Sequence, residues 1–249
     1  METTIPKTST VLASLLRADF TTQWRNRRAV VLTLIVPVII LMTWKGIGVS
    51  GPFILSNSIT IGLFASGLMG YSNSIARDRD KGIFQRLRVA PVPSWAIMSS
   101  RLLVQLAMII MTTTIVFIIG KDYDGINLTP AAYALTYLTS IIGGAVSLSL
   151  GQMIVGGIKN PETVNSTTRL VYLAFILVGM FGEIYQNKLR KILADAVEYS
   201  PYGAVKTILS TSMEPDKWTN HTTTALLVTI GYAIVFATFG IKWFKWNTK

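Results

Sequence analysis

Residues 53–93 read FILSNSITIGLFASGLMGYSNSIARDRDKGIFQRLRVAPVP. The part up to Ala76 is uncharged, and seven charged residues then fall between Arg77 and Arg88. A helix needs about 20 apolar residues to cross the hydrocarbon core of a bilayer, which is about 30 Å thick. The stretch therefore predicts a membrane-spanning helix that is followed by a charged segment at the membrane surface.

The composition of the whole chain supports lipid as its solvent. Of its 249 residues, 51% are hydrophobic and only 14% are charged, whereas soluble domains are about 25% charged. The chain has no cysteine and one histidine, His221. These counts exclude a disulfide framework, a thiolate metal site and a metal site built from several histidines of one chain.

Six apolar runs are candidate spans, although the fifth is short, since its uncharged part covers only residues 170–182. They are residues 29–48, 53–76, 99–120, 131–157, 164–182 and 223–243. Helices are expected because a bilayer leaves open backbone groups unsatisfied, and the alternating pattern of a transmembrane barrel is missing. The sequence predicts an all-α integral membrane protein, with six transmembrane helices in one domain that covers residues 1–249.

The basic residues predict the orientation of these spans. With the N-terminus in the cytoplasm, 16 of the 23 lysine and arginine residues fall on the cytoplasmic side. The acidic residues divide five to seven, which leaves the whole net charge of +11 on that side. Cytoplasmic loops carry such an excess, so we expect both termini in the cytoplasm and need no nucleic-acid partner to explain the charge.

Residues 10–28 precede the first span and are amphipathic. Leu12, Leu16, Phe20 and Trp24 recur at intervals of four, and basic residues lie elsewhere around the helix. This pattern predicts a helix that lies in the membrane interface. The alternative is an ordinary basic flank of the first span.

Two spans carry small residues at every fourth position, which allows close approach of helix backbones in lipid. Such ridges serve either packing within the chain or a subunit interface. The candidate residues for these roles are Ser58, Gly62, Ser66, Gly70, Gly143, Ser147 and Gly151.

Residues 183–222 form a long external loop with helical spacing of apolar residues on both sides of Pro201. The spacing predicts two short helices that dip into, or rest on, the outer leaflet. Backbone at that depth is tolerated only against protein or a water-filled cavity.

Signatures of catalysis are missing from the sequence. No G-x-x-x-x-G-K-[ST] loop and no intramembrane carboxylate pair occur, so we expect neither an enzyme nor a metal site, and no bound cofactor in this chain. The spans offer amides instead of the buried charges that proton relays use. Asn57, Gln105 and Gln152 are the candidates for facing a substrate path.

The charged segment that follows the second span, residues 77–98, has its own helical pattern. Asp78 and Asp80 would begin a short helix, and Ile83, Phe84 and Leu87 would form its apolar face. Pro91 and Pro93 would end it. So short a helix is marginal in water and needs a surface to pack on, either the chain's own cytoplasmic face or a partner.

The segment ARDRDKGIFQRLRVAPVPSWAIMSSRLL, residues 76–103, resembles the link between the second and third spans of type-2 ATP-binding-cassette exporter permeases. The matching features are an acidic–basic run, Gly82, an apolar-basic turn and Pro91. The amphipathic N-terminal helix, the six spans and the proline of the first span, Pro37, agree with that family. Asp78 and Asp80 stand where family members often have glutamate.

The resemblance implies that the segment is a coupling helix, which docks into a separate ATPase subunit. Two copies of that subunit would hold ATP and Mg, and the permease would pair with a second permease chain, as a homodimer in the simplest case, in a bacterial plasma membrane. The residues implied in docking are Asp78, Arg79, Asp80, Lys81, Ile83, Phe84, Arg86, Leu87 and Arg88.

The uncharged span interiors favour a hydrophobic or amphipathic cargo, such as a drug, an antibiotic or a lipid-linked molecule. A polysaccharide exporter of the same family is an alternative, and Tyr133, Tyr137, Tyr172 and Phe175 leave it open. An ATP-independent channel or carrier is a second alternative.

Overall fold

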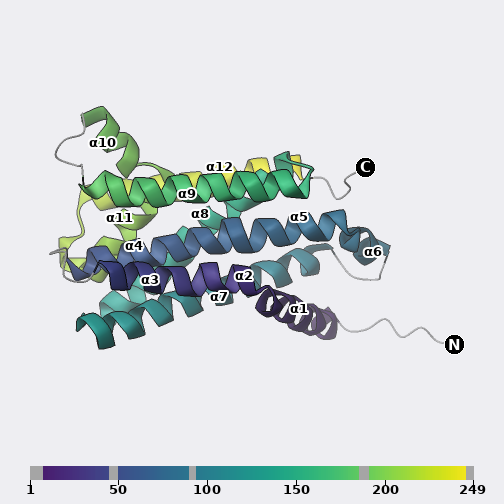
Figure 1. Ribbon diagram of the computed structural model, residues 1–249, viewed down its shortest axis with the longest axis horizontal. Helices are drawn as coiled ribbons and strands as arrows, with labels where there is room; N and C mark the ends of the chain where they lie inside the picture. The colour runs from purple at the N-terminus through teal and green to yellow at the C-terminus, as the bar shows by residue number, and fades with distance from the viewer. Residues whose placement is uncertain (1–7, 45–49, 90–93, 185–190, 245–249) are drawn as a thin grey trace.

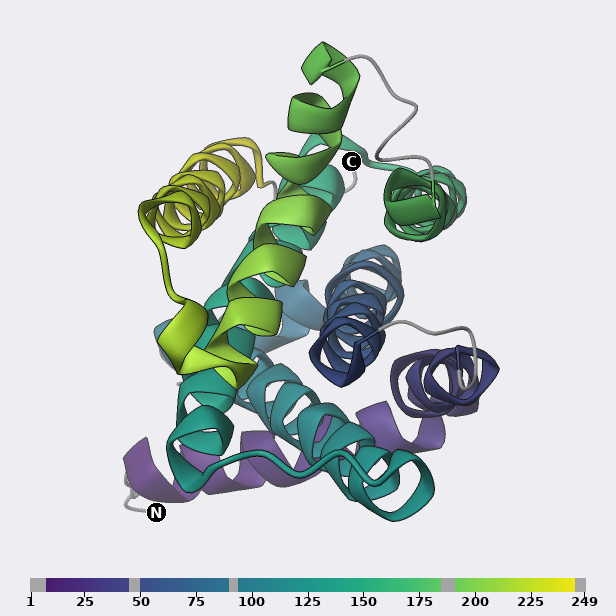
Figure 2. The same cartoon turned by 90° about the vertical axis from the view of Figure 1, so that its left-hand side faces the viewer.

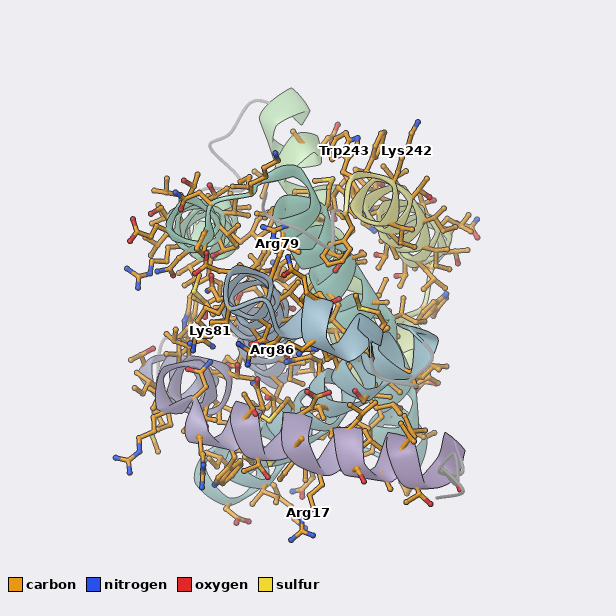
Figure 3. All side chains as sticks on the ribbon, turned by 90° about the vertical axis from the view of Figure 1, so that its right-hand side faces the viewer. Arg17, Arg79, Lys81, Arg86, Lys242 and Trp243 are labelled. Carbon is orange, nitrogen blue, oxygen red and sulfur yellow. The ribbon has the colours of Figure 1, made fainter. Side chains whose placement is uncertain are left out.

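The computed structural model describes residues 8–44, 50–89, 94–184 and 191–244, and every regular element in these ranges is a helix. The longer helices pack side by side as a bundle (Figure 1). One end of the bundle carries Arg17, Arg79, Lys81, Arg86 and Lys242 (Figure 3). We call it the basic end, and we call the opposite end, which carries α10 and α11, the far end.

The first helix, α1 (Thr8–Arg25), lies crosswise to the bundle at the basic end (Figures 2 and 3). It packs against α7, while Phe20 and Trp24 remain exposed and stack on each other with ring centroids 6.1 Å apart. A crosswise amphipathic helix with exposed aromatic rings is the arrangement expected of an interface helix.

A widened helix follows α1. The chain continues from α2 (Arg27–Val30) through the π-helix η1 (Val31–Ile35) into α3 (Val36–Thr43). Pro37 has no N–H and so cannot bond the carbonyl four residues earlier, that of Thr33. The Thr112 hydroxyl of α7 donates to this carbonyl at 3.2 Å, which satisfies it.

The stretch that opened the sequence forms the centre of the bundle. The helix α4 (Gly51–Phe64), the π-helix η2 (Ala65–Ser72) and the helix α5 (Asn73–Asp80) are continuous, and we call them together the central helix. All of its residues from 53 to 72 are buried. Gly82 then turns the chain at φ +66°, a left-handed conformation that glycine adopts without strain. The short helix α6 (Ile83–Val89) follows the turn.

The other helices complete the bundle around this centre. They are α7 (Ser94–Asp124), α8 (Pro130–Gly157), α9 (Pro161–Ile184), α10 (Lys191–Glu198), α11 (Pro201–Met213), the 3-10 turn η3 (Pro215–Lys217) and α12 (Asn220–Trp243).

Four helices of the described residues are long and apolar enough to cross a membrane: Gly51–Asp80, Ala96–Asp122, Pro130–Gly157 and Asn220–Trp243. The first predicted span contains a shorter apolar helix, Val31–Thr43, and α9 is not among the four. The structure therefore supports an integral membrane helical protein, but six spans are not confirmed.

The predicted pair of short helices before the last span is present as α10 and α11. Pro201 begins α11, and the hydroxyl of Ser200 caps that helix by accepting from the backbone N–H of Gly203 at 3.0 Å. The helix α11 packs into the far end against α4, α8 and α12 (Figure 2). Its apolar residues are buried in protein, which accounts for their helical spacing.

A close helix crossing joins η2 to α8. A Cβ added to Gly67 would lie 2.2 Å from the carbonyl oxygen of Ser147, and one added to Gly151 would lie 2.4 Å from that of Gly67. Only glycine lets these two backbones touch. This crossing fixes the central helix against α8 in the middle of the bundle.

Candidate functional site

The charged segment lies at the basic end, but its helix begins later than the sequence predicted. Asp78 and Asp80 belong to the last turn of α5, and α6 starts only at Ile83. The prediction that the two aspartates begin the short helix is therefore wrong, because the turn at Gly82 separates them from it.

Arg79, one of the predicted docking residues, is buried within the chain. Only 1% of it is exposed, and its guanidinium donates to the backbone carbonyls of Val155, Ile158 and Lys159 at 2.7, 2.6 and 2.9 Å. These carbonyls lie at the end of α8, where a helix leaves acceptors unpaired and where a cation is favoured. Arg79 therefore fastens α5 to the last turn of α8.

A second arginine, Arg101 of α7, joins three segments. Its Nη1 lies 2.6 Å from Oδ2 of Asp78 in α5, and its Nη2 lies 3.9 Å from Oδ1 of Asp19 in α1. Ser100 donates its hydroxyl to the Asp19 carboxylate. The interface helix, the central helix and α7 thus meet at one guanidinium.

The surroundings of Asp19 shift its acidity. Burial raises the pKa of the Asp19 carboxyl and the negative charge of Asp78 adds to the rise, while the Ser100 hydrogen bond and the Arg101 charge oppose it. A cavity of about 20 Å³ lies between Asp19 and Arg101, which is enough room for one water.

Phe84 is fully buried in the chain itself. Its ring meets that of Phe244 edge-on at 6.1 Å between centroids, and the Arg101 guanidinium lies over it at 5.0 Å. In this conformation Phe244 and Arg101 cover the Phe84 ring, and its predicted role as an anchor in a partner stays a prediction. Phe84 here holds α6 against the bundle.

The remaining side chains of the segment have different surroundings. Lys81 and Arg86 are exposed at the basic end (Figure 3). Asp80 is exposed as well, and Ile83 is half-buried. The side chains of Leu87 and Arg88 lie outside the described residues, although their backbone belongs to α6. A partner at this end would therefore meet the charged edge of the turn rather than the buried ring of Phe84.

The three predicted path residues are each hydrogen-bonded inside the chain and are not brought together. Asn57 Oδ1 accepts from the Tyr202 hydroxyl at 2.6 Å. Gln105 bonds Ser66 and Gln23, and Gln152 accepts from the Tyr71 hydroxyl at 2.8 Å. In this conformation they link helices to one another.

The small-residue ridges lie inside the chain as well. Gly62 faces Pro37 and Thr112, and Ser66 donates to Gln105 at 2.8 Å. The remaining members are Ser58, buried in α4; Gly70, beside Gln23 and Gln105; Gly143, beside Leu63 and Val205; and Ser147 and Gly151, which lie against η2.

The aromatic residues considered for a sugar path also pack internally. Tyr133 and Tyr137 meet Phe117 edge-on, at 4.9 and 5.6 Å between centroids. Phe175 packs on Phe64, and Tyr172 is buried.

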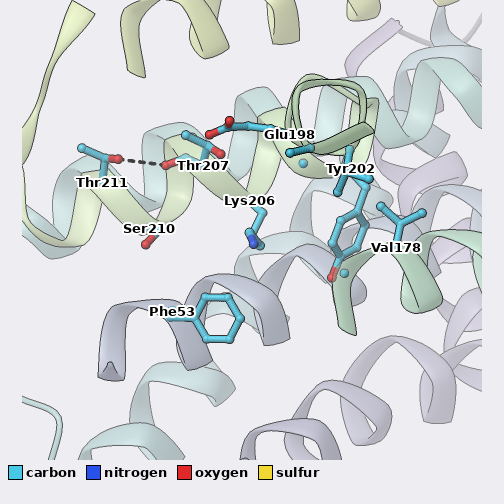
Figure 4. A pocket seen from close by; sticks show the side chains of 12 residues that line it. Phe53, Val178, Glu198, Tyr202, Lys206, Thr207, Ser210 and Thr211 are labelled. Carbon is cyan, nitrogen blue, oxygen red and sulfur yellow. Dashed lines mark hydrogen bonds between the residues drawn. The ribbon is translucent and has the colours of Figure 1, made fainter. Parts of the chain in front are cut away.

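A cavity of about 180 Å³ opens at the far end, between α4, α9, α10 and α11. Lys206 and Phe53 line it, with the Lys206 ammonium 4.8 Å from the ring centroid, and Tyr202 closes one side (Figure 4). Tyr202 bonds Asn57. Asn57 therefore lies directly behind the wall of this cavity.

Sequence reasoning missed Asp19, Arg101 and Gly67 as positioning residues. Asp19 is the one acid between Thr8 and Arg25, on an otherwise basic interface helix, and that contrast is a usable signal for a buried ion pair. Arg101 lies inside a run that is otherwise uncharged from Ile97 to Gly120. Gly67 falls beside the four-residue ridge, and no sequence feature distinguishes it from the other glycines of that span.

The chain is similar in sequence to known proteins. A protein of Bacillus subtilis (strain 168) named "Putative transport permease YvfS" is 22% identical over 125 residues, which are 50% of this chain and 51% of that protein. The chain thus spans about half the length of the curated relative that it matches. The sequence model of ABC-2 type transporters matches residues 10–187. This match runs from α1 to the end of α9 and includes every helix that meets at Arg101, so the chain belongs to the ABC-2 type transporter family.

Proposed function

We propose that this chain is the membrane-spanning permease subunit of an ATP-driven exporter in a bacterial plasma membrane. Its basic end would face the cytoplasm, and the helices from α2 to α12 would cross the membrane six times. A separate ATPase, in two copies, would bind ATP and Mg and drive a pair of permease chains, with a homodimer as the simplest pair.

The observation that carries this proposal is the turn between α5 and α6. It presents Asp80, Lys81 and Arg86 at the basic end, while Arg79 and Phe84 fix its base to the bundle. A movement imposed on the turn by a partner would pass directly to the central helix and to α8. A rigidly based turn with an exposed charged edge is suited to transmit such a movement.

The exposed charges suit the edge of a protein interface, where they set register and association rate more than affinity. The partly exposed Ile83 is the apolar contact that remains available beside them. This assignment takes Ile83 as the apolar contact in the conformation in which Phe84 is covered, and it keeps Lys81 and Arg86 as the basic contacts.

The cargo is proposed to be hydrophobic or amphipathic, of drug or lipid type. The stretches 53–76, 102–120, 130–157 and 222–241 of the four long apolar helices carry no charged residue. Ionisable residues mark ion and proton pathways in membranes, so their absence from these stretches supports an uncharged surface for the cargo. No contact in the described residues favours the polysaccharide alternative, since the aromatic side chains in question pack internally.

The test is co-purification of the full-length chain from its native membrane. We expect a soluble chain with a phosphate-binding loop and ATPase activity to accompany it. The double substitution Lys81→Glu with Arg86→Glu should remove that chain, while Lys217→Glu at the far end should keep it. If transport persists without ATP and without such a chain, the protein is a channel or a carrier instead.

The cargo class has a separate readout. Amphipathic compounds should stimulate the ATPase activity of the purified complex. Stimulation by inorganic ions alone would remove this cargo class and leave the permease assignment standing.

A further inference from the structure

A second cavity lies at the basic end, one helical turn before the α5–α6 turn. Its volume is about 260 Å³, many times the roughly 10–15 Å³ that holds one water. Its walls come from Asn26 and η1, from the continuous helix η2–α5, and from the start of α9, which are three parts of the chain far apart in the sequence. The cavity is thus formed by the tertiary packing of several helices.

Two helices line this cavity with the same pair of side chains at the same spacing. Asn73 and Arg77 lie four residues apart on α5, and Asn165 and Arg169 lie four residues apart on α9. Side chains four residues apart share one face of a helix. Each helix therefore presents an amide and a guanidinium to the cavity.

The charges of the lining favour an anion. Glu162 also borders the cavity, so two arginines and one carboxylate leave one net positive charge. Within the described residues, no ion pair joins Arg77 or Arg169 to a carboxylate. Guanidinium groups bind phosphate through two parallel hydrogen bonds, and a phosphodiester carries the single negative charge that balances the site.

One buried acceptor in the lining lacks a donor. Asn73 Nδ2 donates to the Met69 carbonyl at 3.3 Å, whereas Asn73 Oδ1 is buried with no hydrogen-bond partner among the described atoms. A buried polar atom without a partner costs free energy. A hydroxyl on the ligand would supply the missing donor, so the fitting ligand carries a phosphate ester and a hydroxyl.

The surroundings favour a lipid as the source of this group. Leu32 of η1 lines the cavity, and its neighbours Val31 and Ile35 are exposed apolar residues. On α9, Leu170 and Leu173 are exposed directly after Arg169. A cavity at the level of an interface helix, with apolar surface beyond it, matches a headgroup whose acyl chains remain in the bilayer.

We propose that Arg77, Arg169, Asn73 and Asn165 form a binding site for the phosphate of a hydroxyl-bearing phospholipid headgroup, of the phosphatidylglycerol class. The phosphate lies between the two arginines, and a headgroup hydroxyl donates to Asn73 Oδ1. The site is separate from the turn between α5 and α6 and does not depend on which cargo is exported.

The experiment uses the purified full-length chain in neutral detergent, with dioctanoyl phosphatidylglycerol as the probe and native mass spectrometry as the readout. We expect one tightly held lipid per chain. Arg77→Gln and Arg169→Gln should each weaken binding about tenfold, which corresponds to about 1.4 kcal/mol for a lost charge-assisted contact. Asn73→Asp, which keeps the size of the side chain, should weaken it through repulsion.

Matched controls distinguish specific lipid binding in the cavity from nonspecific electrostatic binding to the basic surface of the protein. Arg17→Gln alters an exposed arginine on α1 outside the cavity (Figure 3) and should leave binding unchanged. Dioctanoyl phosphatidylcholine lacks both the net charge and the hydroxyl and should bind weakly.

Three outcomes would overturn the proposal. The first is equal binding of the two lipids, and the second is an equal loss of binding in Arg17→Gln. The third is binding of free glycerol phosphate as tight as that of the lipid, which would assign the site to a soluble phosphate ester instead.

Discussion

Arg101 Nη1 of α7 lies 2.6 Å from Oδ2 of Asp78 in α5, and both side chains are nearly buried. This pair ties the end of the central helix to α7 beside the turn between α5 and α6. Arg101→Gln removes the cation that Asp78 and Asp19 both face, so the two buried carboxylates lose their compensation. We expect the free energy of unfolding to fall by about 3 kcal/mol, measured by thermal unfolding in detergent.

An exposed ion pair at the far end provides the control for Arg101. Lys217 Nζ lies 2.8 Å from Oε1 of Glu214, with the lysine side chain 71% exposed. Lys217→Gln should change stability by less than about 1 kcal/mol. Equal losses in Arg101→Gln and Lys217→Gln would show that the buried pair has no special role.

Arg79→Lys tests whether the end of α8 depends on the shape of the guanidinium or only on its charge. Lysine keeps the charge, but one ammonium cannot reach three carbonyls from the positions of a planar fork. We expect a loss of about 2 kcal/mol and faster amide hydrogen exchange in residues 155–159. Unchanged exchange there would mean that other contacts hold the last turn of α8.

Gly67→Ala places a methyl group against the carbonyl of Ser147. Neither backbone can withdraw from this crossing without moving a whole helix, so the variant should lose about 1–3 kcal/mol. Gly231→Ala on α12 is the matched control, because a Cβ there meets nothing within 4 Å. If both variants unfold at the temperature of the unaltered protein, the two helices are less closely packed than the structure shows.

Asp19 predicts a pH dependence of stability. Its pKa is raised in the folded protein, mainly by burial, so the folded state holds this proton more tightly than the unfolded state does. The free energy of unfolding should then fall as pH rises above about 4, the ordinary pKa of aspartate. Asp19→Asn removes this titration, and its stability should decline less over the same range. A steeper decline in the variant would contradict the sign of the shift.

The layout of the helices could be predicted from the sequence because it follows from hydrophobic periodicity. The apolar runs, the interface helix and the two short helices around Pro201 all appear in the structure. Each of these rests on which side chains share a face, and that is a local property. The number of spans could not be predicted in this way, because α3 is short and α9 begins with polar residues, so neither matches the length of about 20 apolar residues that a span needs.

The roles of single residues could not be predicted in the same way. Periodicity indicates that Phe84 needs a cover, but not that Phe244, far along the chain, provides it. Arg77 and Arg79 look alike in sequence, although one lines a cavity and the other is buried against α8. Such assignments depend on contacts between distant segments, and charge alone does not distinguish them.

The π-helix η2 has a mechanical consequence for the basic end. The Ser72 hydroxyl donates to the carbonyl of Gly67, five residues earlier, at 2.8 Å within this widened turn. Returning η2 to an ordinary winding by one residue would rotate α5 by about 100° and shift it by about 1.5 Å along its axis. That rotation would swing Arg79 off the carbonyls of α8 and Asp78 off Arg101. The contacts of Arg79 with α8 and of Arg101 with Asp78 therefore oppose the tightening of η2 and hold it in its widened form.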